Sequence, residues 1–154
     1  MKTKRTWKEK LLDSKDLPKV KAITEKQEKR WGKGTIAIPS PLEVDSIMKT
    51  VPKGKVITIN QIRDRIAKAH DATIGCPITT GIFSWIAANA AQEDLKAGQK
   101  VTPYWRTLKE GGIINEKYPG GLEKQAMLLE QEGHDIIQKG KNWVVADWVK
   151  AKID

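Results

Sequence analysis

Few side chains in this sequence could carry out chemistry on their own. Its 154 residues include one cysteine, Cys76, and two histidines, His70 and His134. A single thiol excludes an intramolecular disulfide framework and a cysteine-rich zinc site, and two histidines argue against a histidine-rich metal centre. We expect Cys76 to be a buried structural thiol, and the alternative is an enzyme that uses it as a nucleophile. The sequence therefore predicts no metal site, and it points to no cofactor.

A group of small side chains is better suited to binding than to catalysis. Pro77 can begin a helix that runs to about Glu93. The helix is indicated by residues that follow one another at helical spacing, namely Ile78, Ile82, Trp85, Ile86 and Asn89. We expect Phe83 and Trp85 to belong to the core. The face predicted to be exposed then holds Thr79, Thr80, Gly81 and Ser84. Small residues let a helix approach a groove, and hydroxyls can donate to phosphate oxygens. The alternative is that this face packs against another segment of the chain.

The positive charge is concentrated near the N-terminus. The chain carries 28 basic and 19 acidic residues, a net charge of +9. Residues 1–35 hold twelve basic and five acidic residues, whereas residues 36–154 hold sixteen and fourteen. A basic arm attracts polyanions by releasing condensed counterions, and nucleic acid is the commonest such partner. We expect the arm to neutralise phosphates through side chains such as Lys2, Lys4, Arg5, Lys8 and Lys10. The alternative is a solubilising leader without a ligand.

The elements that must position these groups are predicted to be mostly helical. Thr6 can cap one or two turns of helix, and Ser40 followed by Pro41 can begin a helix that runs to about Lys49. Thr58 and Gln61 match a capping box, which predicts a helix over residues 59–70 with a buried stripe at Ile59, Ile62 and Ile66. Between the first two helices, residues 15–33 are mostly charged, and we expect loosely held, extended structure there.

Two helices joined by a short connection, at residues 59–70 and 77–93, form the pattern of a helix-turn-helix. A further short helix is predicted at residues 123–131, closed by Gly133. Residues 135–145 read as a hairpin with its turn at residues 139–142, and a hairpin after a helical module is compatible with a wing.

Four sequence blocks in a fixed order then carry a resemblance. They are residues 51–62 (a Pro-Lys-Gly-Lys turn before the capped helix), 103–107 (Pro-Tyr-Trp-Arg-Thr), 118–122 (Tyr-Pro-Gly-Gly-Leu) and 128–133 (Leu-Leu-Glu-Gln-Glu-Gly). Over residues 48–134 the chain resembles the DNA-binding domain of the methylated-DNA–protein cysteine methyltransferases. The resemblance implies a mainly α fold with a small β component, a winged-helix-like domain built on a helix-turn-helix.

The reactive positions depart from that family's pattern. Its methyl acceptor is a cysteine activated by a histidine and a glutamate, and the matching positions here hold Tyr104, Trp105 and Glu132. A phenol with a pKa of about 10 and no adjacent base is a poor acceptor, so methyl transfer is not expected. The chain is in this respect similar to the non-catalytic alkyltransferase-like proteins, which bind alkylated guanine in DNA. Thr80 matches the arginine with which the family fills the base stack, and Ile59 matches the tyrosine that helps to rotate the target phosphate. Base flipping would therefore lack two groups that offset the free-energy cost of unstacking a base.

The resemblance also assigns a pocket and a basic contact. Tyr104, Trp105 and Tyr118 either line the remnant of the alkylguanine pocket, where a base could stack, or fill that pocket and seal it. Arg106 is expected to form a buried ion pair, with a phosphate contact as the alternative. Glu132 is expected to cap or pair locally.

These observations predict a basic arm at residues 1–39, a methyltransferase-like domain at 40–146 and a tail at 147–154. The expected function is non-catalytic binding of double-stranded DNA, plain or alkylated, in repair or damage recognition, with a repair protein as a further partner. The alternatives are a protein-interaction module with a sealed pocket and an enzyme that uses Cys76. No apolar run approaches the roughly 20 residues of a membrane span, and no secretory signal is visible, so a cytoplasmic protein is expected.

Overall fold

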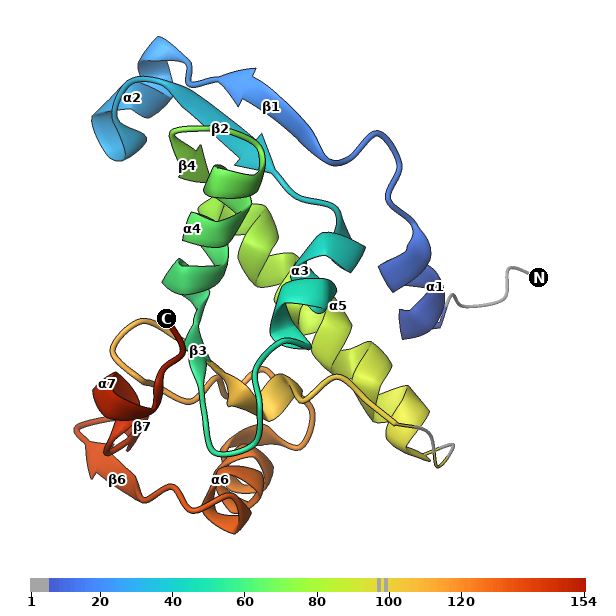
Figure 1. The fold of residues 1–154 in the computed structure, drawn as a ribbon, viewed down its shortest axis with the longest axis vertical. Coiled ribbons are helices and arrows are strands. Elements are labelled where there is room, and N and C mark those ends of the chain that lie inside the picture. Colours follow the sequence, from blue (N-terminus) through green and yellow to red (C-terminus); the bar gives the residue numbers. More distant parts are fainter. Residues whose placement is uncertain (1–5, 97, 99) are drawn as a thin grey trace.

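Helices make up a larger share of the chain than strands in the computed structural model, which describes residues 6–96, 98 and 100–154 (Figure 1). The α-helices are α1 (Trp7–Leu12), α2 (Glu25–Trp31), α3 (Pro41–Met48), α4 (Ile59–Ala69), α5 (Pro77–Lys96), α6 (Gly121–Gln131) and α7 (Trp148–Ala151). The strands are β1 (Lys19–Ala22), β2 (Thr35–Ile38), β3 (Ile57–Thr58), β4 (Ile74–Gly75), β5 (Thr107–Leu108), β6 (Ile136–Lys139) and β7 (Asn142–Val145). A 3-10 turn, η1 (Tyr104–Arg106), precedes β5. A mainly α fold with a small β component is what the sequence predicts.

The long helix α5 runs through the middle of the molecule, and α1, α3 and α4 pack against it (Figure 1). Its buried side chains are all small, namely those of Thr80, Ser84, Ala87, Ala88, Ala90 and Ala91. Small side chains let neighbouring elements approach the helix axis, and larger ones from those elements fill the space at interior density. Met48 of α3 and Ile62 and Ile66 of α4 are fully buried in this cluster.

The predicted pair of helices is present. Thr58 caps α4 by accepting a hydrogen bond from the Gln61 amide, and the Gln61 side chain accepts one from the Thr58 amide. This closes the capping box that the sequence indicates, since each side chain satisfies a backbone donor at the start of the helix. Ser40 caps α3 by accepting a hydrogen bond from the Glu43 amide, with Pro41 at the first turn, and Thr6 caps α1 by accepting one from the Glu9 amide. The connection between α4 and α5 contains the short strand β4.

The expectation of loosely held structure over residues 15–33 is wrong. Residues 19–22 form β1, which pairs antiparallel with β2, and β2 pairs in parallel with β4 to give a three-stranded sheet. Thr24 and Gln27 close a second capping box at the start of α2. Local patterns do not reveal this sheet, because β1 is an edge strand whose residues are mostly exposed and which pairs with β2 across the intervening helix α2.

A second hydrophobic cluster lies at the other end of the molecule. There β3 pairs in parallel with β5, and the predicted hairpin forms from β6 and β7, with a turn at residues 140–141. Val56, Leu108, Leu129 and Val145 are buried between these strands and α6. The C-terminal residues pack on the same cluster, because the Ile153 amide donates to the Val56 carbonyl beside β3.

Candidate nucleic-acid interface

The face of α5 that lies open to solvent differs from the one that the sequence predicts. Thr80 and Ser84 are buried, and only Thr79 and Gly81 of the small-residue group are half-buried. The Tyr118 hydroxyl donates to Ser84 Oγ at 3.1 Å, and Ser84 in turn donates to the Gly81 carbonyl at 2.9 Å. The prediction that Thr80 and Ser84 face outward is therefore wrong. They are buried because their small side chains make room for bulky aromatic neighbours.

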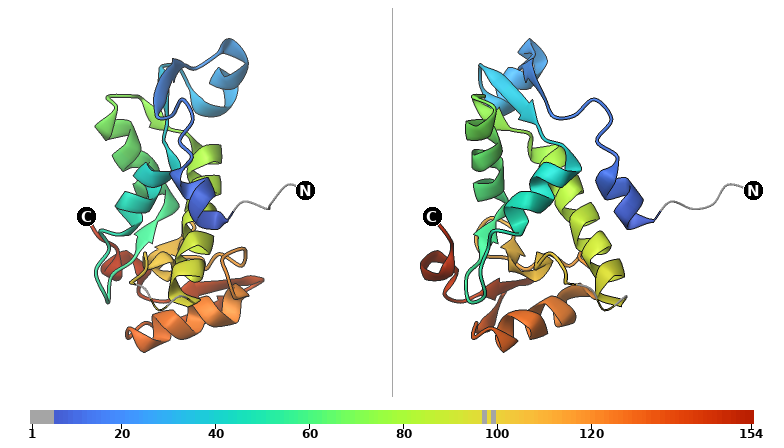
Figure 2. Two further views of the ribbon diagram at one scale, coloured as in Figure 1. Left: turned by 90° about the vertical axis from the view of Figure 1, so that its right-hand side faces the viewer. Right: turned by 45° about the vertical axis from the view of Figure 1, so that its right-hand side comes forward.

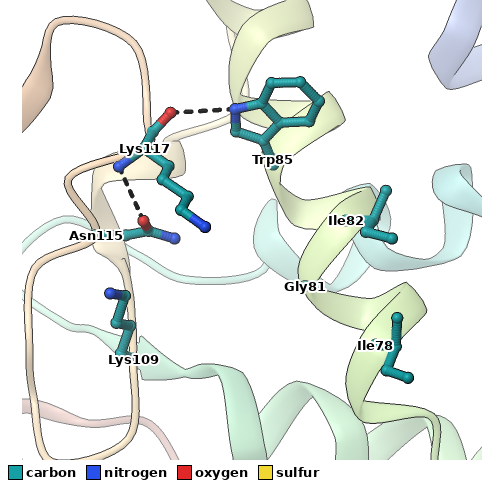
Figure 3. A pocket seen from close by; sticks show the side chains of 7 residues that line it. All are labelled: Ile78, Gly81, Ile82, Trp85, Lys109, Asn115 and Lys117. Carbon is teal, nitrogen blue, oxygen red and sulfur yellow. Dashed lines mark hydrogen bonds between the residues drawn. The ribbon is translucent and has the colours of Figure 1, made fainter.

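The exposed face of α5 is apolar. Ile78 is 54% exposed, Ile82 48% and Trp85 37%, although their helical spacing resembles that of a buried stripe. Together with Gly81 they form one wall of a groove of about 480 Å³. The opposite wall belongs to the loop of residues 109–117 and presents Lys109, Asn115 and Lys117 (Figure 3). This groove, with an apolar helix on one side and two lysines on the other, is the candidate site.

The loop is held in place by hydrogen bonds. Trp85 Nε1 donates to the Lys117 carbonyl at 3.1 Å, and the Lys117 amide donates to Asn115 Oδ1 at 3.0 Å (Figure 3). From the inside, the buried Gln125 accepts from the Asn115 amide and donates to the carbonyls of Trp105 and Thr107. The groove is thus a preformed feature. The loop residues and Gln125 are not among the site residues that the sequence predicts. The available signal for the loop is the glycine pair at residues 111–112, which follows Lys109 and Glu110.

The aromatic residues predicted to line a pocket are brought together, and they fill the space between them. The Tyr104 ring lies edge-to-face with Trp105 at 5.4 Å and with Tyr118 at 5.9 Å between ring centroids. Tyr104 is fully buried and Tyr118 is 3% exposed. Tyr104 also donates its hydroxyl to the Pro119 carbonyl at 3.3 Å. Of the two interpretations of this cluster, the geometry supports the sealed pocket.

Burial also sets the ionisation of these phenols. Loss of solvation raises the pKa of Tyr118 to about 12, despite opposing hydrogen bonds from Ser84 and Asn115. Burial likewise raises the pKa of Tyr104 above its usual value. The charged form of a buried phenol is disfavoured because the surrounding medium has a low dielectric constant. Burial therefore favours the neutral form of both hydroxyls.

Arg106 and Glu132 form the ion pair predicted for Arg106. Arg106 Nε lies 2.9 Å from Glu132 Oε1, its second nitrogen 2.6 Å from Oε2, and a third donates to the Val51 carbonyl at 2.7 Å. Burial acts to raise the pKa of the Glu132 carboxyl, but the hydrogen bond and charge of Arg106 outweigh it, so the pKa lies below its usual value. With its donors used inside the protein, Arg106 is a structural cation that joins η1 to the end of α6.

The first arm cations that the structure describes lie beside α5. Lys8 forms an ion pair with Asp94 at 3.5 Å, and its amide donates to Glu93. Lys10 lies 4.2 Å from the centroid of the Trp7 ring, and that ring packs edge-on against Trp85. Lys2, Lys4 and Arg5 lie outside the described residues. The arm is therefore anchored to the helix that forms the candidate site.

Cys76 is the single thiol of the sequence and the remaining candidate nucleophile. Cys76 is buried, as predicted, and its sulfur accepts a hydrogen bond from the Thr79 amide at 3.5 Å. Within residues 6–96, 98 and 100–154, no group of three or more histidine, cysteine, aspartate or glutamate side chains could hold a metal ion. None of the helices in that part of the chain combines the length and the apolar character that a membrane span requires.

Comparison with known structures places the chain in a fold that has been seen bound to DNA. It matches the crystal structure of Schizosaccharomyces pombe Atl1 in complex with damaged DNA containing O6-carboxymethylguanine, with a TM-score of 0.54 and 20% sequence identity over 74% of this chain and 94% of that chain. The crystal structure of S. pombe ATL in complex with DNA matches with the same values. No model of a known protein family matches, and no curated protein does. The chain thus shares the fold of an alkyltransferase-like protein.

Proposed function

We propose that this protein is a non-catalytic DNA-binding protein that holds duplex DNA against the exposed face of α5. The observation that carries the proposal is the preformed groove between Ile78 and Ile82 on that helix and Lys109 and Lys117 on the facing loop. An α-helix fits the major groove of B-DNA, apolar side chains can contact thymine methyl groups, and lysines neutralise phosphates. The fold shared with DNA-bound Atl1 supports the same partner.

The absence of catalysis in this proposal rests on the state of each candidate nucleophile. Tyr104 is buried, hydrogen-bonded to a backbone carbonyl and held neutral, and Trp105 beside it is not a base. Alkyl transfer requires an ionisable, accessible nucleophile next to a proton acceptor. Cys76 is buried as well, and Glu132 is engaged by Arg106. The alternative of an enzyme that uses Cys76 has no geometric support.

The finer part of the proposal concerns damaged DNA. The Atl1 complex, which contains O6-carboxymethylguanine, supports recognition of alkylated guanine by this fold. Tyr104, at the position that the resemblance assigns to the acceptor cysteine, is fully buried, and so is Thr80, at the position of the base-stack arginine. In our proposal a lesion is therefore sensed from the groove, through Ile78, Ile82 and the loop lysines, and no base is taken into the interior.

The experiment is a binding titration of the full chain with three labelled ligands: a plain duplex, the same duplex with one alkylated guanine, and a single strand. We expect duplex binding that weakens steeply as salt rises, because phosphate contacts release counterions. Ile82→Glu, which places a negative charge in the groove, is expected to weaken duplex binding at least tenfold. The matched control is Val149→Glu on α7, an exposed apolar position at 62% exposure that lies outside the groove.

The outcomes separate this function from the second candidate. Unchanged binding by Ile82→Glu, or no binding by the wild-type protein, would overturn the proposal. The exposed isoleucines also favour a protein-interaction module, because monomeric proteins rarely leave a large apolar patch uncovered. That alternative predicts no duplex binding at any salt concentration and a co-purifying partner that nuclease treatment does not release.

A further inference from the structure

The short helix α2 has no buried residue, yet it is well formed. Its capping box satisfies the first backbone donors, and Glu25 and Glu28 lie in its first turn, where negative charge is favourable. Three exposed cations, Lys26, Lys29 and Arg30, follow the i, i+3, i+4 spacing that places side chains on one face of a helix. α2 thus carries a cationic stripe that has no role in the core.

The opposite side of α2 fixes the helix to the protein. Trp31 lies about 140° around the helix axis from Lys26 at 100° per residue, and it packs against the buried cluster of Ile23, Ile36 and Cys76. Cys76 immediately precedes Pro77, the first residue of α5. The stripe therefore points away from the cluster, while the cluster couples the position of α2 to the start of α5.

The sheet strengthens this coupling. β2 pairs with β4 through Ile36 and Ile74, and the Cys76 amide donates to the Ala37 carbonyl at 2.9 Å. Arg63 Nε of α4 donates to the Gly75 carbonyl at 3.0 Å, and the backbone of that arginine packs so closely on Gly75 that a Cβ there would lie 2.3 Å from its carbonyl oxygen. α2, β4 and α5 are thus held in a defined geometry.

α2 lies on the same side of α5 as the loop that forms the opposite wall of the groove. In the left view of Figure 2, α2 projects at the upper right beyond α5, on the same side as the loop that precedes α6, whereas α4 and α7 lie on the opposite side. Lys26, Lys29, Arg30 and Lys33, which follows the C-cap Gly32, are all exposed. In the part of the chain that the structure describes, none of these four side chains pairs with a carboxylate.

From this geometry we infer that α2 is a second DNA contact, a cationic stripe that binds the sugar-phosphate backbone of the same duplex beyond the N-terminal end of α5. The inference rests on the proposed function, because the duplex must lie on α5 for α2 to reach it. Charge complementarity favours a phosphate backbone over a base edge, since the stripe consists of lysine and arginine on exposed, flexible stems. The stripe therefore adds affinity and length to the footprint without adding sequence preference.

The test is the salt dependence of duplex binding by the full chain with Lys26, Lys29, Arg30 and Lys33 all changed to Gln. Each lost phosphate contact lowers the slope of log K against log salt by about 0.9, so we expect a decrease of about 2–4 and weaker binding at low salt. On a series of duplexes of increasing length, the wild type should gain affinity on longer duplexes where the variant does not. Gln keeps helix propensity, and circular dichroism checks that the fold is retained.

The matched control changes four exposed lysines outside α2 and the groove, Lys53, Lys55, Lys68 and Lys150, to Gln. The last two belong to α4 and α7, the helices on the opposite side in Figure 2. It removes the same net charge and is expected to leave the slope within about 1 of the wild type. A second variant with Arg at Lys26, Lys29 and Lys33 should keep the wild-type slope. If the α2 variant and the control behave alike while the wild type binds duplex, the inference fails and the proposed function stands. If the wild type does not bind, both fail.

Discussion

Replacing Tyr104 tests whether it seals the interior or serves a ligand. Tyr104→Ala removes a fully buried ring from between Trp105 and Tyr118, whereas Tyr104→Phe removes only the hydroxyl that donates to the Pro119 carbonyl. The two variants separate packing from hydrogen bonding at one position. If Tyr104 is a core residue, most of its contribution to the free energy of unfolding comes from the packing of its ring, and little comes from its hydroxyl.

The magnitudes follow from the contacts. Truncation of a buried aromatic ring to alanine costs about 3–5 kcal/mol, and the two edge-to-face contacts that are lost place Tyr104→Ala near the upper end of that range. The hydrogen bond to Pro119 is long at 3.3 Å. Its loss in Tyr104→Phe is therefore expected to cost about 1 kcal/mol or less. Tyr104→Leu, which fills part of the space, should fall between the two.

The assay is urea denaturation followed by tryptophan fluorescence, since Trp105 contacts the ring that is removed. Equal slopes for the wild type and the variants would show that the change lies in the free energy of unfolding. Duplex binding is then measured well below each denaturation midpoint. Because Tyr104 has no exposed surface, we expect the dissociation constant for plain duplex to change by less than about twofold, or about 0.4 kcal/mol.

Two results would refute the reasoning. A cost below about 1 kcal/mol for Tyr104→Ala would mean that the ring is not part of a packed core. A selective loss of binding to alkylated duplex in folded Tyr104→Ala, with plain duplex unaffected, would show that the ring stacks on a modified base. That second result would restore the open-pocket interpretation.

Two further predictions concern the elements around this cluster. Glu132→Gln should lower the free energy of unfolding by about 2–4 kcal/mol at neutral pH, because it leaves Arg106 without its partner. The pKa of Glu132 in the folded protein lies below its unfolded value near 4.5. The stabilisation by its carboxylate is therefore complete above that value and is lost as the pH falls through the folded pKa. Denaturation at neutral and at acidic pH should show that the difference in unfolding free energy between the wild type and Glu132→Gln becomes smaller in acid. Gly112→Ala places a Cβ 2.3 Å from the Trp148 ring, whereas Gly111→Ala, at a similar positive φ, meets nothing closer than 3.8 Å. Thermal denaturation should therefore show that Gly112→Ala is less stable than Gly111→Ala by about 1–3 kcal/mol. Equal melting temperatures for the two variants would contradict the predicted clash with Trp148.

The elements that the sequence predicts correctly are those specified by local rules. The Thr58–Gln61 capping box, the Ser40 cap and the hairpin turn at residues 140–141 each depend on side chains a few residues apart. The Thr24–Gln27 box obeys the same rule and could have predicted α2. The charged residues around it led instead to the expectation of loosely held, extended structure. The pairing of β1 with β2 is a contact between separate segments that no local pattern encodes.

The orientation of α5 could not be predicted for a different reason. Both sides of the helix carry apolar residues, and a hydrophobicity scale ranks Ile78 and Ile82 above alanine. Which side is buried depends on the size of the neighbours: the fully buried Tyr104 and the Tyr118 ring leave room only for small side chains such as Ser84. Tertiary packing overrides the periodicity here.

The cost of leaving Ile78, Ile82 and Trp85 exposed is an argument for a ligand that covers them. Full burial of a large apolar side chain contributes about 1.5–3 kcal/mol, and these three, which are 37–54% exposed, forgo roughly a third to a half of it. The alanines on the other side of α5 show that the helix also forms with small residues. The apolar wall is rimmed by Lys109 and Lys117. A purely apolar partner would leave those charges unsatisfied, and a purely ionic one would leave the isoleucines in water. A grooved polyanion that presents thymine methyl groups between two rows of phosphates satisfies both, and duplex DNA has that form.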